Sequence, residues 1–233
     1  MTTPARESLL DLIATHSFKL GDFTLASGQK SDYYIDCRIT TLHAEGGRLA
    51  GLVLYDLIHD QVPDSETIEA VGGLTMGADP LVSNIASTSA WALADHTEIL
   101  ALAGEEGFED EGEEEYDAEG EDEDEPAPTL IHGFLVRKAE KTHGTGRRIE
   151  GFLRAGARIV IVDDVCTTGG STITAIEAAR EAGMTVAAVL CLVDREQGGR
   201  ARIEAALDDG SVPFLTAFTA SDVRAAHLAL NPR

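Results

Sequence analysis

The hydrophobic residues of this 233-residue chain follow two patterns that alternate along the sequence. Short and nearly continuous apolar runs are typical of strands that are covered on both faces, whereas apolar residues at every third or fourth position are typical of amphipathic helices. The predicted strands are 68–71, 130–136, 158–162, 185–193 and 214–218, and the predicted helices are 5–17, 44–59, 78–95, 171–182 and 200–207. This alternation predicts an α/β fold, with a central parallel sheet flanked by helices.

The N-terminal part, about residues 1–40, has a different pattern. Two strand-like runs within Phe18–Arg38 surround a Ser-Gly turn, and Lys30 follows that turn. A chain of this length can bury a substantial core in one domain. We therefore expect a single domain over residues 1–233, in which the first 40 residues form a small separate layer.

The formal net charge of −23 is concentrated in one segment. Residues 104–126 contain fifteen acidic residues and no lysine or arginine, which leaves −8 for the rest of the chain. Such a segment repels itself and has little to bury, so we expect a disordered insert. The alternative is that it docks on a basic surface of a partner or competes for the cationic segment Arg137–Gly146.

Composition agrees with a soluble cytoplasmic enzyme. The sequence has no apolar run near the roughly 20 residues that a membrane span needs, and its N-terminus lacks the apolar region of a signal peptide. Its three cysteines lie far apart, which favours reduced thiols in the cytosol. The histidines show no metal-ligand spacing, so we expect no metal site built by histidines. Because the sequence has no membrane-spanning run and no basic helix-turn-helix segment, we expect neither a membrane nor a nucleic acid as partner.

The most informative segment is 159–172, where an aliphatic strand leads into Asp163 and Asp164 and then into hydroxyl and glycine residues. Ligands of parallel sheets bind beyond the carboxyl ends of the strands, and a glycine-rich loop before a helix can bind phosphate through its N–H groups. Two carboxylates would repel a phosphate, so they suit sugar hydroxyls or Mg²⁺. Together they predict a ribose phosphate site, although Asp, Thr and Ser are also common helix caps.

This segment closely resembles the 5-phosphoribosyl 1-diphosphate (PRPP) signature of type I phosphoribosyltransferases. Three further segments resemble the orotate phosphoribosyltransferase family in particular: Phe18–Arg38 is similar to its N-terminal hood, Arg137–Gly146 to its mobile catalytic loop, and the Asp194-Arg195 pair to its orotate-binding arginine. Gly72–Pro80 is similar to the family's pyrophosphate loop. Each segment alone could be an ordinary strand, connection or solvated charge cluster, but all of them occur in the family's order.

The resemblance implies the type I phosphoribosyltransferase fold and transfer of the phosphoribosyl group from PRPP to orotate, which gives orotidine 5′-monophosphate (OMP). It implies catalytic roles for Lys141, His143, Asp163 and Asp164. The implied PRPP contacts are Arg137, Lys138, Lys141, His143, Asp163, Asp164, Val165, Cys166, Thr167, Thr168, Gly169, Gly170 and Ser171, with Thr75 and Met76 in the pyrophosphate loop. The implied orotate contacts are Lys30, Tyr34, Ile35, Thr167 and Arg195.

The resemblance also implies a Mg²⁺ ion that is held mainly by PRPP, a homodimer with shared active sites, and a cis peptide between Leu74 and Thr75. The chain departs from some members of the family at Ala26 and Met76, where they carry lysines that face PRPP. Two alternatives stay open. One is a transferase for another base, and the other is a PRPP-sensing regulator without catalysis.

Overall fold

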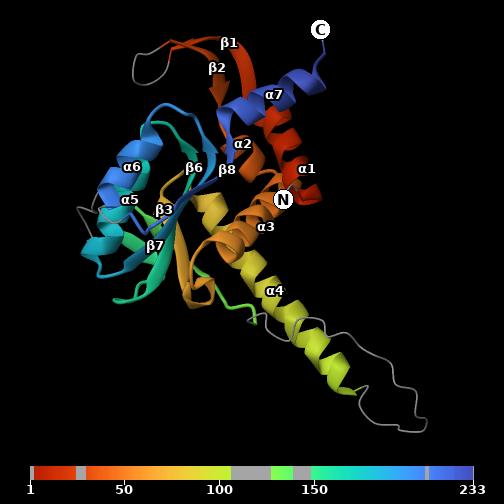
Figure 1. The fold of residues 1–233 in the computed structure, drawn as a ribbon, viewed down its shortest axis with the longest axis vertical. Coiled ribbons are helices and arrows are strands. Elements are labelled where there is room, and N and C mark those ends of the chain that lie inside the picture. The colour runs from red at the N-terminus through yellow and green to blue at the C-terminus, as the bar shows by residue number, and fades with distance from the viewer. Residues whose placement is uncertain (1–2, 25–29, 106–126, 139–147, 208–209, 233) are drawn as a thin grey trace.

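The computed structural model describes residues 3–24, 30–105, 127–138, 148–207 and 210–232, and its central element is a six-stranded sheet (Figure 1). The strand order is β5-β4-β3-β6-β7-β8. The strands are β3 (Ala70–Leu74), β4 (His132–Val136), β5 (Ile149–Gly151), β6 (Arg158–Cys166), β7 (Thr185–Asp194) and β8 (Phe214–Thr219). All neighbours are parallel except β5, which pairs antiparallel with β4 at the edge. The predicted α/β fold is confirmed, and β5 was not predicted.

Helices cover both faces of this sheet, and β6 shows how the sequence directs them. Ile159 and Ile161 point into the cluster under α5 (Gly170–Glu181) and α6 (Gly199–Leu207). Val160 and Val162 point into the other cluster, which packs against α1 (Pro4–Leu12), α3 (Ala44–Gln61), α4 (Asp79–Glu105) and α7 (Ala220–Leu230). All four side chains are buried, and each contributes roughly 1.5–3 kcal/mol by leaving water. A continuous aliphatic strand is therefore what a sheet covered on both faces requires.

The N-terminal hood is a separate two-stranded sheet of β1 (Phe18–Thr24) and β2 (Lys30–Ile35), paired antiparallel. It lies beyond the carboxyl ends of the central strands, beside α7 (Figure 1). Helix α7 connects this hood to the body, since Arg224 forms an ion pair of 2.6 Å with Asp32 and the His227 ring hydrogen-bonds the Ala14 carbonyl at 2.8 Å. The hydrophobic pattern did not predict α7.

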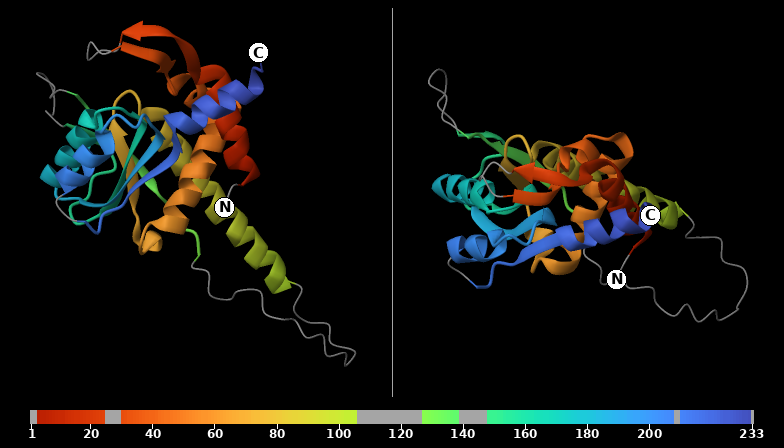
Figure 2. Two further views of the ribbon diagram at one scale, coloured as in Figure 1. Left: turned by 45° about the horizontal axis from the view of Figure 1, so that its top comes forward. Right: turned by 90° about the horizontal axis from the view of Figure 1, so that it is seen from above.

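Two predicted helices end elsewhere in the structure. The first helix stops at Leu12 and is followed by a π-helical turn over Ile13–Ser17, although we expected a helix to residue 17. Helix α4 continues to Glu105, well past the expected end at residue 95, and its distal half projects from the body (Figure 2). Trp91, near the middle of the helix, is 71% exposed, and Ile99, in the distal half, is 65% exposed. The helix therefore extends beyond the part that the core stabilises.

The acidic insert was expected to begin at residue 104, but the first two of its residues belong to α4. The rest of it, residues 106–126, lies outside the described residues, so its predicted disorder stays a prediction. Within the described part of the chain, no helix is both long and apolar enough to cross a membrane.

Candidate active site

A cavity of about 320 Å³ lies beyond the carboxyl ends of β3, β6 and β7, under the hood. It combines residues from five segments that are far apart in the sequence. The lining residues are Tyr34, Ile35, Asp36, Arg38, Leu74, Thr75, Met76, Gly77, Lys138, Asp163, Asp164, Val165, Thr167, Ser171 and Arg195. This is the edge at which parallel sheets bind their ligands, so most of the predicted site residues meet where the fold predicts.

Asp163 organises the start of α5 from within the cavity wall. One carboxylate oxygen, Oδ2, accepts hydrogen bonds from the hydroxyls of Ser171 at 2.5 Å and Thr172 at 2.8 Å, and Oδ1 accepts the Asp164 N–H at 3.1 Å. Burial raises the pKa of its carboxyl group, and these three donors oppose that rise. Both oxygens are engaged by the protein, so Asp163 holds the loop between β6 and α5 in place.

Asp164 is the less constrained carboxylate of the pair. Its Oδ1 accepts the Val165 N–H at 2.9 Å, which leaves Oδ2 without a hydrogen bond from the described residues. Burial and, second, the charge of Asp163 raise the pKa of the Asp164 carboxyl group to about 6, against the opposing charge of Arg38. A Cβ atom on Gly77 would overlap this carboxylate, so the glycine lets Asp164 lie against the loop after β3.

The loop between β6 and α5 has the features of a phosphate site. Gly169 has a φ of +75° directly before α5, in the left-handed region that glycine adopts at low cost. The N-terminus of α5 therefore directs its free N–H groups and positive dipole end toward this loop. Thr167 and Ser171 line the cavity. Thr168 does not, and its carbonyl accepts a hydrogen bond from Arg202 at 2.7 Å.

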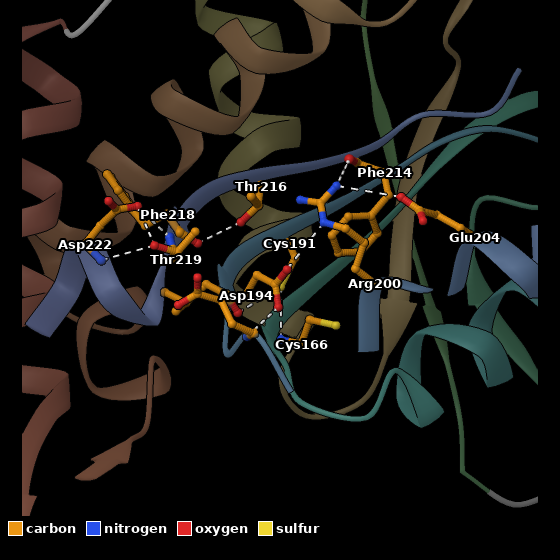
Figure 3. A network of polar contacts seen from close by, with 12 residues as sticks. Cys166, Cys191, Asp194, Arg200, Glu204, Phe214, Thr216, Phe218, Thr219 and Asp222 are labelled. Atoms are coloured by element: carbon orange, nitrogen blue, oxygen red, sulfur yellow. Dashed lines mark hydrogen bonds and ion pairs between the residues drawn. The ribbon is translucent and has the colours of Figure 1, made fainter. Parts of the chain in front are cut away.

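The turn after β7 is held by Asp194, which belongs to the polar network of Figure 3. Its Oδ1 accepts the Glu196 N–H at 2.8 Å, and its Oδ2 lies 3.5 Å from the Nε of Arg200. On the neighbouring strand, the Cys166 N–H donates to the Cys191 sulfur at 3.0 Å. The Arg195 N–H donates to the Cys166 carbonyl at 2.9 Å, so Cys166 and Asp194 both help to hold the turn that carries Arg195.

Arg195 is a buried cation at the hood side of the cavity, with only 6% of its surface exposed. Its guanidinium group stacks on the Tyr33 ring at 4.8 Å, and its Nη2 lies 3.4 Å from the Ser31 hydroxyl. Its Nε is buried and has no hydrogen-bond partner among the described residues. A buried, unsatisfied donor on a planar guanidinium group suits a ligand carboxylate, which can accept two parallel hydrogen bonds.

The predicted cis peptide is one bond out of place. The structure has a cis bond between Thr75 and Met76, whereas we expected it between Leu74 and Thr75. The Thr75 N–H donates to the Val136 carbonyl at 2.9 Å, and Leu74 is paired with Val136 in the sheet. The ladder with β4 therefore continues through the Leu74–Thr75 peptide, and the loop departs from it only afterwards.

Several predicted site residues do not line the cavity. Lys30 extends along the hood, where its Nζ donates to the Thr24 hydroxyl at 2.8 Å, and Arg137 forms an ion pair of 3.3 Å with Glu150. The others are Cys166, Thr168, Gly169 and Gly170. Lys141 and His143 lie outside the described residues, as does Ala26.

Conversely, four lining residues were not predicted as contacts: Asp36, Arg38, Leu74 and Gly77. Asp36 and Arg38 directly follow the predicted orotate contacts Tyr34 and Ile35. The sequence does contain a signal for these two residues, because an acidic and a basic residue two positions apart after a predicted strand can form an ion pair at the edge of a site.

Comparison with known proteins agrees with this geometry. The family model described as "Phosphoribosyl transferase domain" matches residues 133–216. Orotate phosphoribosyltransferase from Synechocystis sp. is 38% identical over 220 residues, which cover 94% of this chain and 88% of that protein. The enzyme from Streptomyces coelicolor is 38% identical, with 93% and 95% covered.

Among solved structures, orotate phosphoribosyltransferase from Mycobacterium tuberculosis in complex with Fe(III) dicitrate has a TM-score of 0.66 at 30% identity, with 94% of this chain and 99% of that chain covered. The same enzyme in complex with PRPP has a TM-score of 0.63 at 28% identity, with the same coverage. Relatives that are this similar over nearly the whole length share more than a fold, and the chain belongs to the orotate phosphoribosyltransferase family.

Proposed function

We propose that this protein transfers the 5-phosphoribosyl group from PRPP to orotate, which produces OMP and diphosphate in pyrimidine nucleotide (UMP) biosynthesis. The observation that carries this proposal is the composition of one cavity. It contains a buried guanidinium group with an unsatisfied donor, Arg195, opposite a phosphate loop and two carboxylates. Orotate has a planar carboxylate, and PRPP has a phosphate and ribose hydroxyls, so the cavity offers a complementary group to each.

PRPP would bind across the end of β6. Its 5-phosphate would accept hydrogen bonds from Thr167, Ser171 and the N–H groups at the start of α5. The ribose hydroxyls would donate to Asp164, whose Oδ2 is available, while Asp163 holds the loop in place. Orotate would lie between Arg195 and the hood residues Tyr34 and Ile35, with its ring nitrogen directed at the anomeric carbon.

A magnesium ion fits this cavity if PRPP supplies most of its ligands. The described residues contain no cluster of three or more acidic, histidine or cysteine side chains that could hold a metal ion alone. Two adjacent carboxylates are present, and Mg²⁺ is commonly bound by one or two carboxylates together with substrate phosphates. Asp164 would contact such an ion, which would neutralise charge on the departing diphosphate.

The reaction breaks the bond between the anomeric carbon and diphosphate, with inversion at that carbon as orotate adds from the other side. Positive charge develops on the sugar and negative charge on the leaving group. Asp164 would stabilise the sugar, and Lys138 would stabilise the diphosphate. Lys141 and His143 would add to this when the loop closes and excludes water. The roles of these two residues come from the resemblance of the loop to that of the family.

The proposed assembly is a homodimer in which each loop serves the partner's site. Two inactive variants, Lys141→Ala and Asp164→Asn, test it by subunit exchange. A hybrid dimer would then contain one doubly defective site and one intact site, so about a quarter of the wild-type activity should return at equal amounts. Verified hybrids without activity would contradict the shared site, because a site built within one subunit stays defective in every combination.

The reaction itself is tested by the loss of orotate absorbance when PRPP and Mg²⁺ are present. Adenine, hypoxanthine and uracil are the comparison substrates, and turnover of one of them in place of orotate would favour a different base. PRPP binding without turnover of any base would favour the regulator.

The three cysteines are free and buried, which suits a reducing cytoplasm as the place of the reaction.

A further inference from the structure

The loop that faces the leaving diphosphate has no cationic side chain of its own. Its four lining residues, Leu74 to Gly77, are uncharged, and the Met76 side chain is 67% exposed. Diphosphate is the most highly charged group in the proposed reaction, so a cation from another segment is expected beside this loop. Among the described lining residues, the candidates are Arg38, Lys138 and Arg195.

Arg195 is held at the hood side of the cavity by its contacts with Tyr33 and Ser31. Lys138, after β4, already has a proposed role in stabilising the diphosphate. Arg38 differs from both because it extends from α2 (Arg38–Thr41), directly after the hood. None of the proposed steps has yet used this residue.

The Arg38 side chain is held in a defined direction by Asp36. Its Nε donates to Oδ1 of Asp36 at 2.8 Å and its Nη2 donates to Oδ2 at 2.7 Å, a two-point contact. The backbone N–H of Arg38 also donates to Oδ1, at 3.2 Å. No described residue accepts a hydrogen bond from Nη1. The guanidinium group is therefore oriented in advance and still has donors to offer, which lowers the entropic cost of binding an anion.

Arg38 lines the same cavity as Asp164, the residue proposed to bind the ribose hydroxyls. Its positive charge acts on the Asp164 carboxylate and opposes the rise in the pKa of that group. Asp164 in turn lies against Gly77, where a Cβ atom would overlap it. Arg38, Asp164 and Gly77 all line the cavity, and in the proposed binding mode the leaving group would separate from the sugar beside Asp164.

We propose that Arg38, oriented by Asp36, binds the diphosphate of PRPP and stabilises it as it leaves. This assignment rests on the proposed function and adds a substrate contact to it. Arg38 supplies the positive charge that the uncharged loop from Leu74 to Gly77 lacks. The opposing view is that the pair is an ordinary surface salt bridge, since 44% of the Arg38 side chain is exposed.

Ligands that differ only in the diphosphate separate these two views. PRPP and inorganic diphosphate contain it, whereas OMP has the phosphate, ribose and orotate without it. Isothermal titration of Arg38→Met with each ligand, in the presence of Mg²⁺, should show roughly tenfold to hundredfold weaker binding of PRPP and diphosphate. Binding of OMP should be nearly unchanged. In turnover, the KM for PRPP should rise much more than the KM for orotate.

Arg48 provides a matched control on α3. It makes the same two-point contact with an acid, Glu45, at 2.9 and 2.7 Å, but it does not line the cavity. Arg48→Met should bind all three ligands like the wild type. Arg38→Lys keeps the charge but loses the planar two-point contact, so it should bind diphosphate better than Arg38→Met and less well than the wild type.

Arg38→Met with a wild-type circular dichroism spectrum and unchanged diphosphate affinity would overturn the assignment. Equal weakening of OMP and diphosphate would also overturn it, because Arg38 would then support the whole site. If Arg38→Met does not fold, Arg38→Lys decides the question. Unchanged diphosphate binding by Arg38→Lys would overturn the assignment, whereas weaker binding of diphosphate with unchanged binding of OMP would support it. Wild-type protein that binds diphosphate through Arg38 but forms no OMP would support the assignment and refute the proposed function.

Discussion

Replacing Asp164 by Asn should stabilise the ligand-free protein at neutral pH while it removes activity. The wild-type protein keeps a carboxylate in a partly buried position next to a second carboxylate, Asp163. Asparagine has nearly the same shape, carries no charge, and can still accept the Val165 N–H that Oδ1 now accepts at 2.9 Å. The substitution therefore removes a desolvated charge without leaving a cavity.

The sign and size of this effect follow from the pKa of the carboxyl group. The ordinary pKa of 3.8 rises to about 6 in the folded protein, so the folded state favours the protonated acid. The contribution of this carboxyl group to the free energy of unfolding is therefore fully present below the unfolded pKa of 3.8, and it is lost as the pH rises through about 6. At 1.36 kcal/mol per pH unit this loss is about 3 kcal/mol. We expect Asp164→Asn to recover about 2 kcal/mol, since a buried amide group is also desolvated.

Urea unfolding of both proteins at about pH 7.5 and about pH 4 measures this difference. Asp164→Asn should be more stable than the wild type at the higher pH, and the two should converge at the lower pH. Asp11→Asn, on the exposed side of α1, is a control for the loss of one carboxylate at the surface. Turnover of Asp164→Asn should fall at least roughly a hundredfold. A variant that is no more stable at neutral pH, or equally stabilised at both pH values, would refute the reasoning.

Two further substitutions probe the site, and one segment replacement probes the acidic insert. Gly77→Ala should lower turnover roughly tenfold or more, because its Cβ would displace Asp164. Gly210→Ala is the control and should have no effect, because no atom lies within 4 Å of a Cβ at that position. Wild-type turnover of Gly77→Ala would show that the loop adapts. Arg195→Lys should raise the KM for orotate roughly tenfold and change that for PRPP much less, and an equal change in both would remove the orotate assignment. Replacing residues 106–126 by a short Gly-Ser linker should leave the melting temperature and turnover nearly unchanged, and insoluble or inactive protein would contradict this.

The local sequence determined the sheet and the position of the site within the chain. The aliphatic residues of β6 alternate between two covered faces, so their pattern alone predicted a buried parallel strand. The acids and glycines that follow it predicted a ribose phosphate site, and Thr167, Ser171 and both aspartates do line the cavity. The strand was confirmed because periodicity is a property of neighbouring residues, and the composition of the loop, which is also local, indicated residues that do meet in one cavity.

The hydrophobic pattern did not determine where α4 ends or that α7 forms. Helix α4 was expected to end at residue 95 and continues to Glu105, although its exposed half has no core to face. Helix α7 was missed, because its attachment depends on partners such as Asp32 and Ala14, about 200 residues earlier in the chain. A pattern within one segment does not contain the position of such distant partners.

The tertiary structure also divided roles that the sequence left equal. Asp163 and Asp164 are adjacent and chemically identical, but only the fold brings Ser171 and Thr172 onto the first and Gly77 against the second. In the same way, Asp36 and Arg38 become lining residues only because the hood lies over the ends of the central strands. The order of residues along a chain specifies which groups are available, whereas burial and the charges of distant neighbours decide what each group can do.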